Sequence, residues 1–140
     1  MWKQNKIKVG PYKRGFHLIT KEVINGVFGL DKISIGIMHV NIMHTSASLT
    51  INENADSTVR DDFESHLNKI VPENEPHYKH TLEGPDDMPA HLKSLITQTN
   101  ISLSLVNKNI MLGIWQGIYL LEHRASPMKR EVLFHLIGEE

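Results

Sequence analysis

The sequence contains no cysteine, which excludes disulfide bonds and thiolate metal sites and leaves the redox compartment undecided. It has no apolar run approaching the roughly 20 residues of a membrane-spanning helix, and its start, "MWKQNKIKVG", lacks the apolar core of a signal peptide. Its formal net charge of -1 provides no overall positive field that would recruit nucleic acid or anionic lipid. We therefore expect a cytoplasmic protein that binds neither nucleic acid nor membranes.

The sequence also lacks a glycine-rich phosphate-binding loop and a dense cluster of lysine and arginine, which dedicated pyrophosphate sites usually contain. What remains is ordinary for a globular protein: 140 residues, 40% of them hydrophobic and 22% charged, which favours one domain over residues 1–140. Histidine is frequent, with nine copies. Because cysteine is absent, any transition-metal site must be built from imidazole and carboxylate groups.

The spacing of apolar residues predicts strands and helices mixed along the chain, which is typical of an α+β fold. We expect packed mixed or antiparallel β-sheets with two or three short helices in a single compact domain. Thr20 is the expected N-cap of a first helix, and Asp56 or Ser57 that of a second, which Pro72 ends. A third, short helix is expected over 88–96 and a terminal β-meander over 101–139, with "NKN" as its first turn.

The segment "HTSASLTINENAD", residues 44–56, combines polar side chains with alternating aliphatic ones. In a strand over 48–52, Leu49 and Ile51 point to one face, and Ser48, Thr50 and Asn52 point to the other. Two interpretations stay open. The polar face is either a solvated edge leading into an Asp-capped helix, or one wall of a polar site that includes His44 and the free N–H groups of the next helix.

The segment "YKHTLEGPDDMPAH" lies within a polar, proline-rich connection too long for an ordinary loop, which favours a functional role. His80 and His91 are eleven residues apart, and Gly84-Pro85 can turn the chain back between them. This is no standard zinc spacing, so metal ligation is only a weak prediction from the residues alone. Asp86 and Asp87 have a simpler reading as carboxylates at the start of a helix.

The segment "GIWQGIYLLEHR" reads as a strand in which Glu122 and His123 point to opposite faces. They cannot both face one pocket in a regular strand. Either one of them is structural, or two pockets or two subunits use the two faces. A surface ion pair between Glu122 and Arg124, on the same face, is the simpler alternative for those two residues.

These three segments resemble the signature blocks of the YjbQ family of secondary thiamine-phosphate synthase proteins, and the resemblance extends over essentially the whole chain, including the ending "HLIGE". It implies a compact α+β fold, a homotrimer, and a divalent metal bound by histidines of the second block. It also implies a weak thiamine-phosphate synthase activity, which joins a pyrimidine pyrophosphate to a thiazole phosphate. A metal-dependent hydrolase of a small phosphorylated metabolite and a non-catalytic metal-binding or metabolite-binding module are the alternatives.

The resemblance and the residue chemistry together give three sets of expected site residues. His80, His91 and His123 are the expected metal ligands, with zinc as the first choice of metal and magnesium as an option for a pyrophosphate substrate. The expected substrate or phosphate contacts are Ser46, Ser48, Gln116 and Arg124. The expected catalytic groups are His44, Glu53, Asp56 and Glu122, of which His44 is also the substitute metal ligand.

Overall fold

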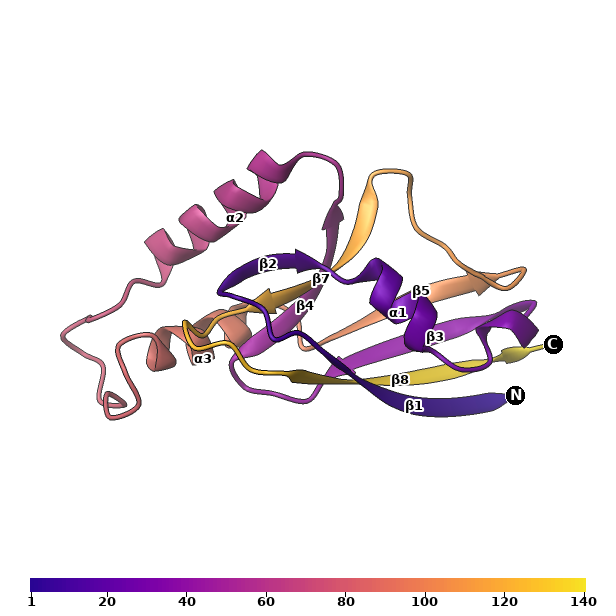
Figure 1. The fold of residues 1–140 in the computed structure, drawn as a ribbon, viewed down its shortest axis with the longest axis horizontal. Helices are drawn as coiled ribbons and strands as arrows, with labels where there is room; N and C mark the ends of the chain where they lie inside the picture. Colours follow the sequence, from indigo (N-terminus) through magenta and orange to yellow (C-terminus); the bar gives the residue numbers. More distant parts are fainter.

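Two antiparallel sheets pack face to face in the computed structural model, which describes residues 1–140 (Figure 1). The five-stranded sheet has the order β1 (Trp2–Val9), β8 (Arg130–Glu139), β3 (Ile35–Ile42), β5 (Asn100–Val106) and β6 (Asn109–Ile110). The three-stranded sheet has the order β2 (Gly15–Leu18), β7 (Gln116–Glu122) and β4 (Ala47–Glu53). The helices are α1 (Thr20–Gly26), α2 (Ser57–Ile70) and α3 (Asp87–Ile96), with a 3₁₀ turn at Leu30–Lys32. The predicted α+β class is confirmed.

The core lies between the two sheets. Met38, Leu49, Leu120 and Phe134, from four different strands, are completely buried in it. Each belongs to the alternate side chains of its strand that point toward the other sheet, because successive side chains of a strand point to opposite faces. Burying one such side chain stabilises the fold by about 1.5–3 kcal/mol.

The alternation predicted for β4 is confirmed. Leu49 is buried in the core, whereas Thr50 and Asn52 lie on the opposite, more exposed face. Strand β3 carries apolar side chains on both of its faces. It pairs with β5 and β8 without interruption, so no bulge rotates one group of these side chains toward the other. Instead Ile35 and Ile37, which are 62% and 53% exposed, lie on the outer face of the five-stranded sheet.

The helix caps follow the sequence in one case and not in the other. Asp56 caps α2, since its Oδ1 accepts hydrogen bonds from the backbone N–H and the hydroxyl of Thr58 at 2.9 and 2.7 Å. Thr20 was expected to cap α1, but it is the first helical residue, and Ile19 is the cap. The Thr20 hydroxyl instead accepts a hydrogen bond from the N–H of Ile118 at 3.0 Å, which ties the helix to β7.

The predicted turn at "NKN" is confirmed, because Asn107 and Lys108 both have positive φ, as a tight hairpin requires. The predicted meander is wrong, because β7 leaves the five-stranded sheet and becomes the central strand of the other one. The physical reason is that β7 is buried on both faces from Gly117 to Glu122, which suits a strand covered by the five-stranded sheet on one side and by α2 on the other.

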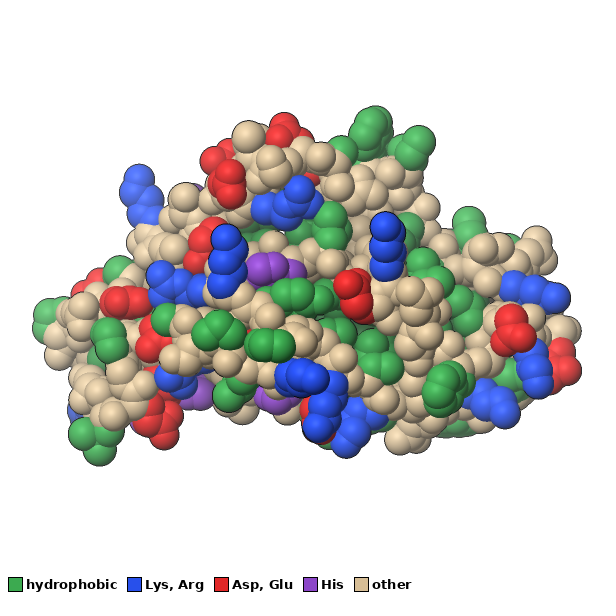
Figure 2. All heavy atoms as spheres, in the orientation of Figure 1, with side chains coloured by type: hydrophobic (Ala, Val, Ile, Leu, Met, Phe, Trp, Pro, Cys, Tyr) green, Lys and Arg blue, Asp and Glu red, His purple; other side chains and the backbone are tan.

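The exposed surface has two notable features. Helix α2 stands over the outer face of the three-stranded sheet (Figure 1), and the loop that precedes β7 projects beside it. Figure 2 shows apolar side chains at the tip of this loop, where Ile114 and Trp115 are exposed. None of the helices is both long enough and apolar enough to cross a membrane.

Candidate metal centre

Asp87 connects the two histidines that flank the Gly-Pro turn. Its Oδ2 lies 2.7 Å from Nε2 of His80 and 3.1 Å from Nε2 of His91. One potential ligand atom from each of the three residues lies within 4.8 Å of the others. Asp87 and His91 are one turn apart on α3 and therefore share a helix face, while His80 reaches them from the long connection.

The orientation of His91 gives this cluster its chemical character. Its Nδ1 lies 2.9 Å from the carbonyl oxygen of Thr45, and a carbonyl can only accept, so Nδ1 carries a proton there. In the neutral ring Nε2 then has a lone pair, which faces the carboxylate of Asp87. Two acceptors so close require a cation between them or an additional proton. The donor set therefore fits a metal ion, with the backbone of Thr45 orienting one ligand.

Arg124 holds the other side of the Asp87 carboxylate. Its Nη1 donates to Asp87 Oδ1, and its Nε donates to Asp86 Oδ2 at 2.9 Å. Burial would raise the pKa of Asp87, but the hydrogen bonds with His80 and Glu83 and the charge of Arg124 outweigh it, and the pKa lies below its usual value. Arg124 thus contributes to the low pKa of Asp87 and occupies Oδ1, which leaves Oδ2 directed at the histidines.

Arg124, Ser46 and Ser48 were expected to share a phosphate, but the structure does not bring them together. The hydroxyl of Ser46 accepts a hydrogen bond from Nη2 of Arg130 at 3.1 Å. Ser48 is fully buried, and its hydroxyl lies 2.8 Å from Nε2 of His123. Both serines are therefore engaged inside the protein, while Arg124 is engaged with Asp86 and Asp87.

His123 does not lie in the cluster, and Asp87 takes the third position instead. The His123 ring is 1% exposed. Burial, followed by the positive charges of Lys93 and Arg130, lowers its pKa to about 3. His44, the expected substitute, accepts the backbone N–H of Glu131 on Nε2 at 2.7 Å. Burial and then the charge of Arg130 lower the pKa of His44.

Glu122 points away from His123, as the alternation predicted. Its carboxylate lies between the sheets and accepts Nε of Arg130 at 2.8 Å and Nη2 at 2.5 Å. The simpler expectation of a surface ion pair between Glu122 and Arg124 is wrong, because the partner side chain is Arg130 and the pair is buried. The sequence reasoning missed Arg130, although it shares the parity of Val132, a core residue of β8.

Glu53, Asp56 and Gln116 lie at the other end of β4 and shape the turns there. Glu53 Oε1 accepts the N–H of Ala55 at 2.9 Å, and Asp56 caps α2. Gln116 Oε1 accepts the N–H of Gly113 at 2.7 Å. The structure does not bring these three residues into the histidine cluster. Asp87, which the sequence reasoning left as a helix-start carboxylate, belongs to it, and its spacing of four from His91 is the signal that could have identified it.

Comparison with known proteins finds relatives that match nearly the whole chain. The family model described as UPF0047 protein YjbQ-like matches residues 5–139. The UPF0047 protein YjbQ of Salmonella typhimurium is 45% identical over 99% of this chain and 100% of its own length, and that of Escherichia coli O157:H7 is 43% identical over the same shares.

Solved structures give the same result. A conserved hypothetical protein from Thermus thermophilus superposes with a TM-score of 0.82 at 32% identity, covering 95% of this chain and 99% of the other. A YjbQ/UPF0047 family protein from Clostridium acetobutylicum superposes with a TM-score of 0.79 at 33% identity, covering 96% and 99%. The chain belongs to the YjbQ (UPF0047) family.

Proposed function

We propose that this chain binds a divalent metal ion through His80, Asp87 and His91 and acts there on a small phosphorylated metabolite. The observation that carries the proposal is that Nε2 of His80 and Nε2 of His91 lie 2.7 and 3.1 Å from the same carboxylate oxygen of Asp87, while the carbonyl of Thr45 holds Nδ1 of His91. Two imidazoles and one carboxylate form a ligand set that leaves further coordination positions open, as in catalytic zinc sites. The two imidazole ligands favour zinc over magnesium.

The protein residues around the ion have distinct tasks. A bound ion would polarise a phosphoryl oxygen or lower the pKa of a water molecule. Arg124 orients and ionises Asp87, and the carbonyl of Thr45 orients His91. The His80 side chain is 47% exposed, so a substrate can approach the cluster from solvent on that side.

Two reactions fit such a site. The family resemblance favours a weak thiamine-phosphate synthase reaction, in which pyrophosphate leaves a pyrimidine and a thiazole phosphate takes its place. The second candidate is hydrolysis of a phosphorylated metabolite, which the position of Glu83 favours. Its carboxylate lies 3.7 Å from Nε2 of His80 and is largely exposed, so it can accept a proton from a nucleophilic water. Glu122, which was expected from the sequence to be catalytic, is buried in its ion pair with Arg130.

The experiment has two stages. Zinc binding is first measured by calorimetry for the wild type, His80→Ala and His91→Ala, with His77→Ala as the control from the same segment. The site is supported if His80→Ala and His91→Ala lose zinc binding and His77→Ala keeps it. It is contradicted if His80→Ala and His91→Ala both bind zinc like the wild type. The wild type and His91→Ala are then assayed, with and without zinc, on the pyrimidine pyrophosphate and thiazole phosphate pair and on simple phosphate monoesters. Zinc-dependent turnover by the wild type alone identifies the reaction.

We also propose that the protein assembles as a homotrimer, as the family resemblance implies. The outer face of the five-stranded sheet supports a trimer, because it carries four apolar residues that are exposed in the single chain: Trp2, Ile35, Ile37 and Ile137. These residues lie together near one end of a face that is polar elsewhere, where Gln4, His39 and His135 are paired. An exposed apolar patch of this kind indicates contact with another chain.

A further inference from the structure

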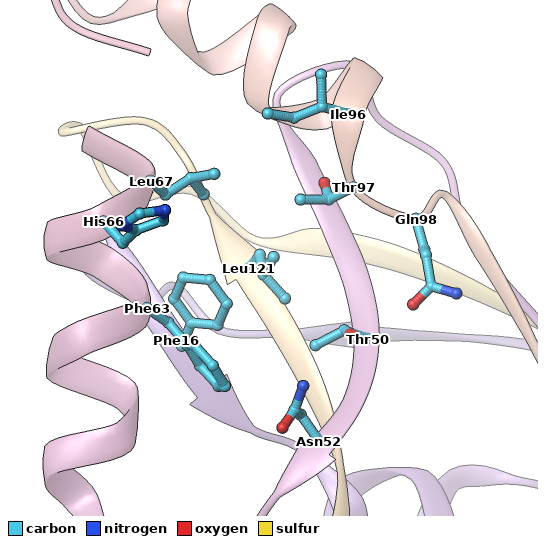
Figure 3. Close-up of a pocket in the computed structure, with 10 residues that line it drawn as sticks. All are labelled: Phe16, Thr50, Asn52, Phe63, His66, Leu67, Ile96, Thr97, Gln98 and Leu121. Atoms are coloured by element: carbon cyan, nitrogen blue, oxygen red, sulfur yellow. The ribbon is translucent and has the colours of Figure 1, made fainter. Parts of the chain in front are cut away.

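A cavity of about 360 Å³ lies between α2 and the outer face of the three-stranded sheet (Figure 3). Its size falls at the lower end of the range typical of sites for small organic molecules. None of the residues of the histidine cluster lines it. The cavity is therefore separate from the candidate metal centre.

Aromatic and aliphatic side chains form one wall of this cavity. The rings of Phe16 and Phe63 lie 5.2 Å apart between their centroids and are tilted by 40°. Leu121 of β7 and Leu67 of α2 continue this surface, and Figure 3 shows all four side chains between the helix and the sheet. Such a wall favours a flat ring, because aromatic side chains contribute binding energy through their faces and edges as well as through buried area.

The opposite wall is polar but uncharged. It is formed mainly by Thr50 and Asn52, the outward-facing residues of β4, whereas His66 lies across from them on α2 (Figure 3). The side chains of Thr50 and His66 make no hydrogen bond within the chain, and Asn52 uses only its Oδ1, which accepts the N–H of Glu53 at 2.8 Å. No lysine, arginine, aspartate or glutamate lines the cavity. Its free donors and acceptors suit a neutral ligand.

The gap is held open by contacts at the C-terminal part of α2. The buried ammonium group of Lys93, in the last turn of α3, donates a hydrogen bond to Asn68 Oδ1 at 2.5 Å. This bond fixes the position of α2 relative to α3. At the middle of the helix, Phe63 rests on Phe16 of β2. These two contacts set the position of α2 over the sheet, and the cavity lies in the space between them and β4.

We propose that this cavity binds a neutral, planar heteroaromatic molecule. Its ring lies against Phe16, Phe63 and Leu121, and its hydrogen-bonding edge faces Thr50 and Asn52. A fatty acyl chain would leave these polar groups unpaired, which costs free energy. A second copy of the chain has the exposed apolar residues on the outer face of the five-stranded sheet available to it.

The cavity also connects to the protein interior. The hydroxyl of Thr97, which lines it, donates its proton to the carbonyl oxygen of Lys93 at 2.6 Å and lies 2.7 Å from the hydroxyl of Ser48, and that hydroxyl lies 2.8 Å from Nε2 of His123. A ligand that contacts Thr97 will therefore disturb the hydrogen bond of the buried histidine. The ring resonances of His123 provide a reporter that is distant from the surface.

The test is a titration of the full-length protein, monitored by NMR at neutral pH. The probes are cytosine, thymine, adenine and nicotinamide, with benzoate as the charged control and cyclohexanecarboxamide as the non-aromatic control. We expect at least one heteroaromatic probe to bind with a Kd in the millimolar range or below and to shift Thr50, Leu121 and the His123 ring. Both controls should bind at least about tenfold more weakly.

Two variants distinguish this cavity from another surface. His66→Trp fills the cavity from α2, and Asp61→Trp adds the same side chain to an exposed position of that helix outside the cavity. Binding should be lost in His66→Trp and kept in Asp61→Trp. The proposal is overturned if no heteroaromatic probe binds at about 5 mM, or if both variants bind like the wild type. It is also overturned if His66→Trp changes the sedimenting mass, because a second copy then occupies the cavity.

Discussion

The Arg130 guanidinium donates two hydrogen bonds to the Glu122 carboxylate, from Nε at 2.8 Å and from Nη2 at 2.5 Å. Both side chains are at most 1% exposed, so the ion pair is completely removed from solvent. Glu122 ends β7 and Arg130 begins β8, so the pair joins one sheet to the other. It fixes the end of β7, from which His123 turns to Ser48 and Arg124 turns to Asp87.

Removing one partner of this pair should destabilise the protein strongly. Arg130→Met leaves the carboxylate of Glu122 buried without its ionic partner, and we expect a loss of about 3–5 kcal/mol in the free energy of unfolding. The double variant Glu122→Leu with Arg130→Met should recover much of this loss. Urea unfolding measures both, with Lys129→Met, an exposed neighbour, as the control. A value for Arg130→Met close to that of the control would contradict the structural role.

The two adjacent aspartates should differ in their effect on metal binding. Asp87 contacts both histidines, whereas Asp86 contacts Arg124 and the N–H of Ala125. Asp87→Asn should weaken zinc binding by about 10- to 100-fold or more, because it removes a charged ligand. Asp86→Asn should have a much smaller effect. Calorimetry measures the zinc affinity of both variants. Equal affinities of Asp87→Asn and Asp86→Asn would show that Asp87 is not a ligand.

Metal binding should weaken as the pH falls from neutral to mildly acidic values. Imidazole ligates a metal only when it is unprotonated, so protons compete with the ion at His80 and His91. Cobalt(II) is a suitable probe, because its visible absorption reports binding directly. Absorption that is constant down to a pH of about 5 would mean that carboxylates alone hold the ion.

His123 should make the stability of the fold depend on pH. Its pKa is about 3 in the folded chain, below the ordinary value of about 6.5 in the unfolded chain. Between these values the unfolded state binds more protons, so the free energy of unfolding falls with decreasing pH, by up to about 1.4 kcal/mol per unit. His123→Gln should lose this component of the slope, and His77→Gln should keep it. Identical slopes for the wild type and His123→Gln would exclude the buried neutral histidine.

The oligomer should depend on the outer face of the five-stranded sheet. The chain has a mass of 16.0 kDa, and sedimentation equilibrium should give three times this value for the wild type. Ile37→Lys places a charge on the apolar face and should produce monomers. Leu82→Lys, in the long connection, should remain trimeric. A monomeric wild type would exclude the trimer, and a trimeric Ile37→Lys would place the contact elsewhere.

Short-range patterns in the sequence determined much of the local structure. Alternation with a period of two placed Leu49 in the core and Thr50 on the outer face of β4, and it separated Glu122 from His123. Asp56 was identifiable as a helix cap because its side chain bonds a backbone N–H only two residues away. These features depend on neighbours along the chain, and such neighbours are visible in the sequence.

Only the tertiary structure decided which side chains meet. His80 and His91 were predicted to lie together because a Gly-Pro turn separates them, but the third member of the cluster is Asp87 rather than His123. Arg130 became the partner of Glu122 because β7 leaves the meander and joins the other sheet. The pairing of strands far apart in the sequence sets these contacts, and a difference of one residue in a strand reverses the face on which a side chain lies.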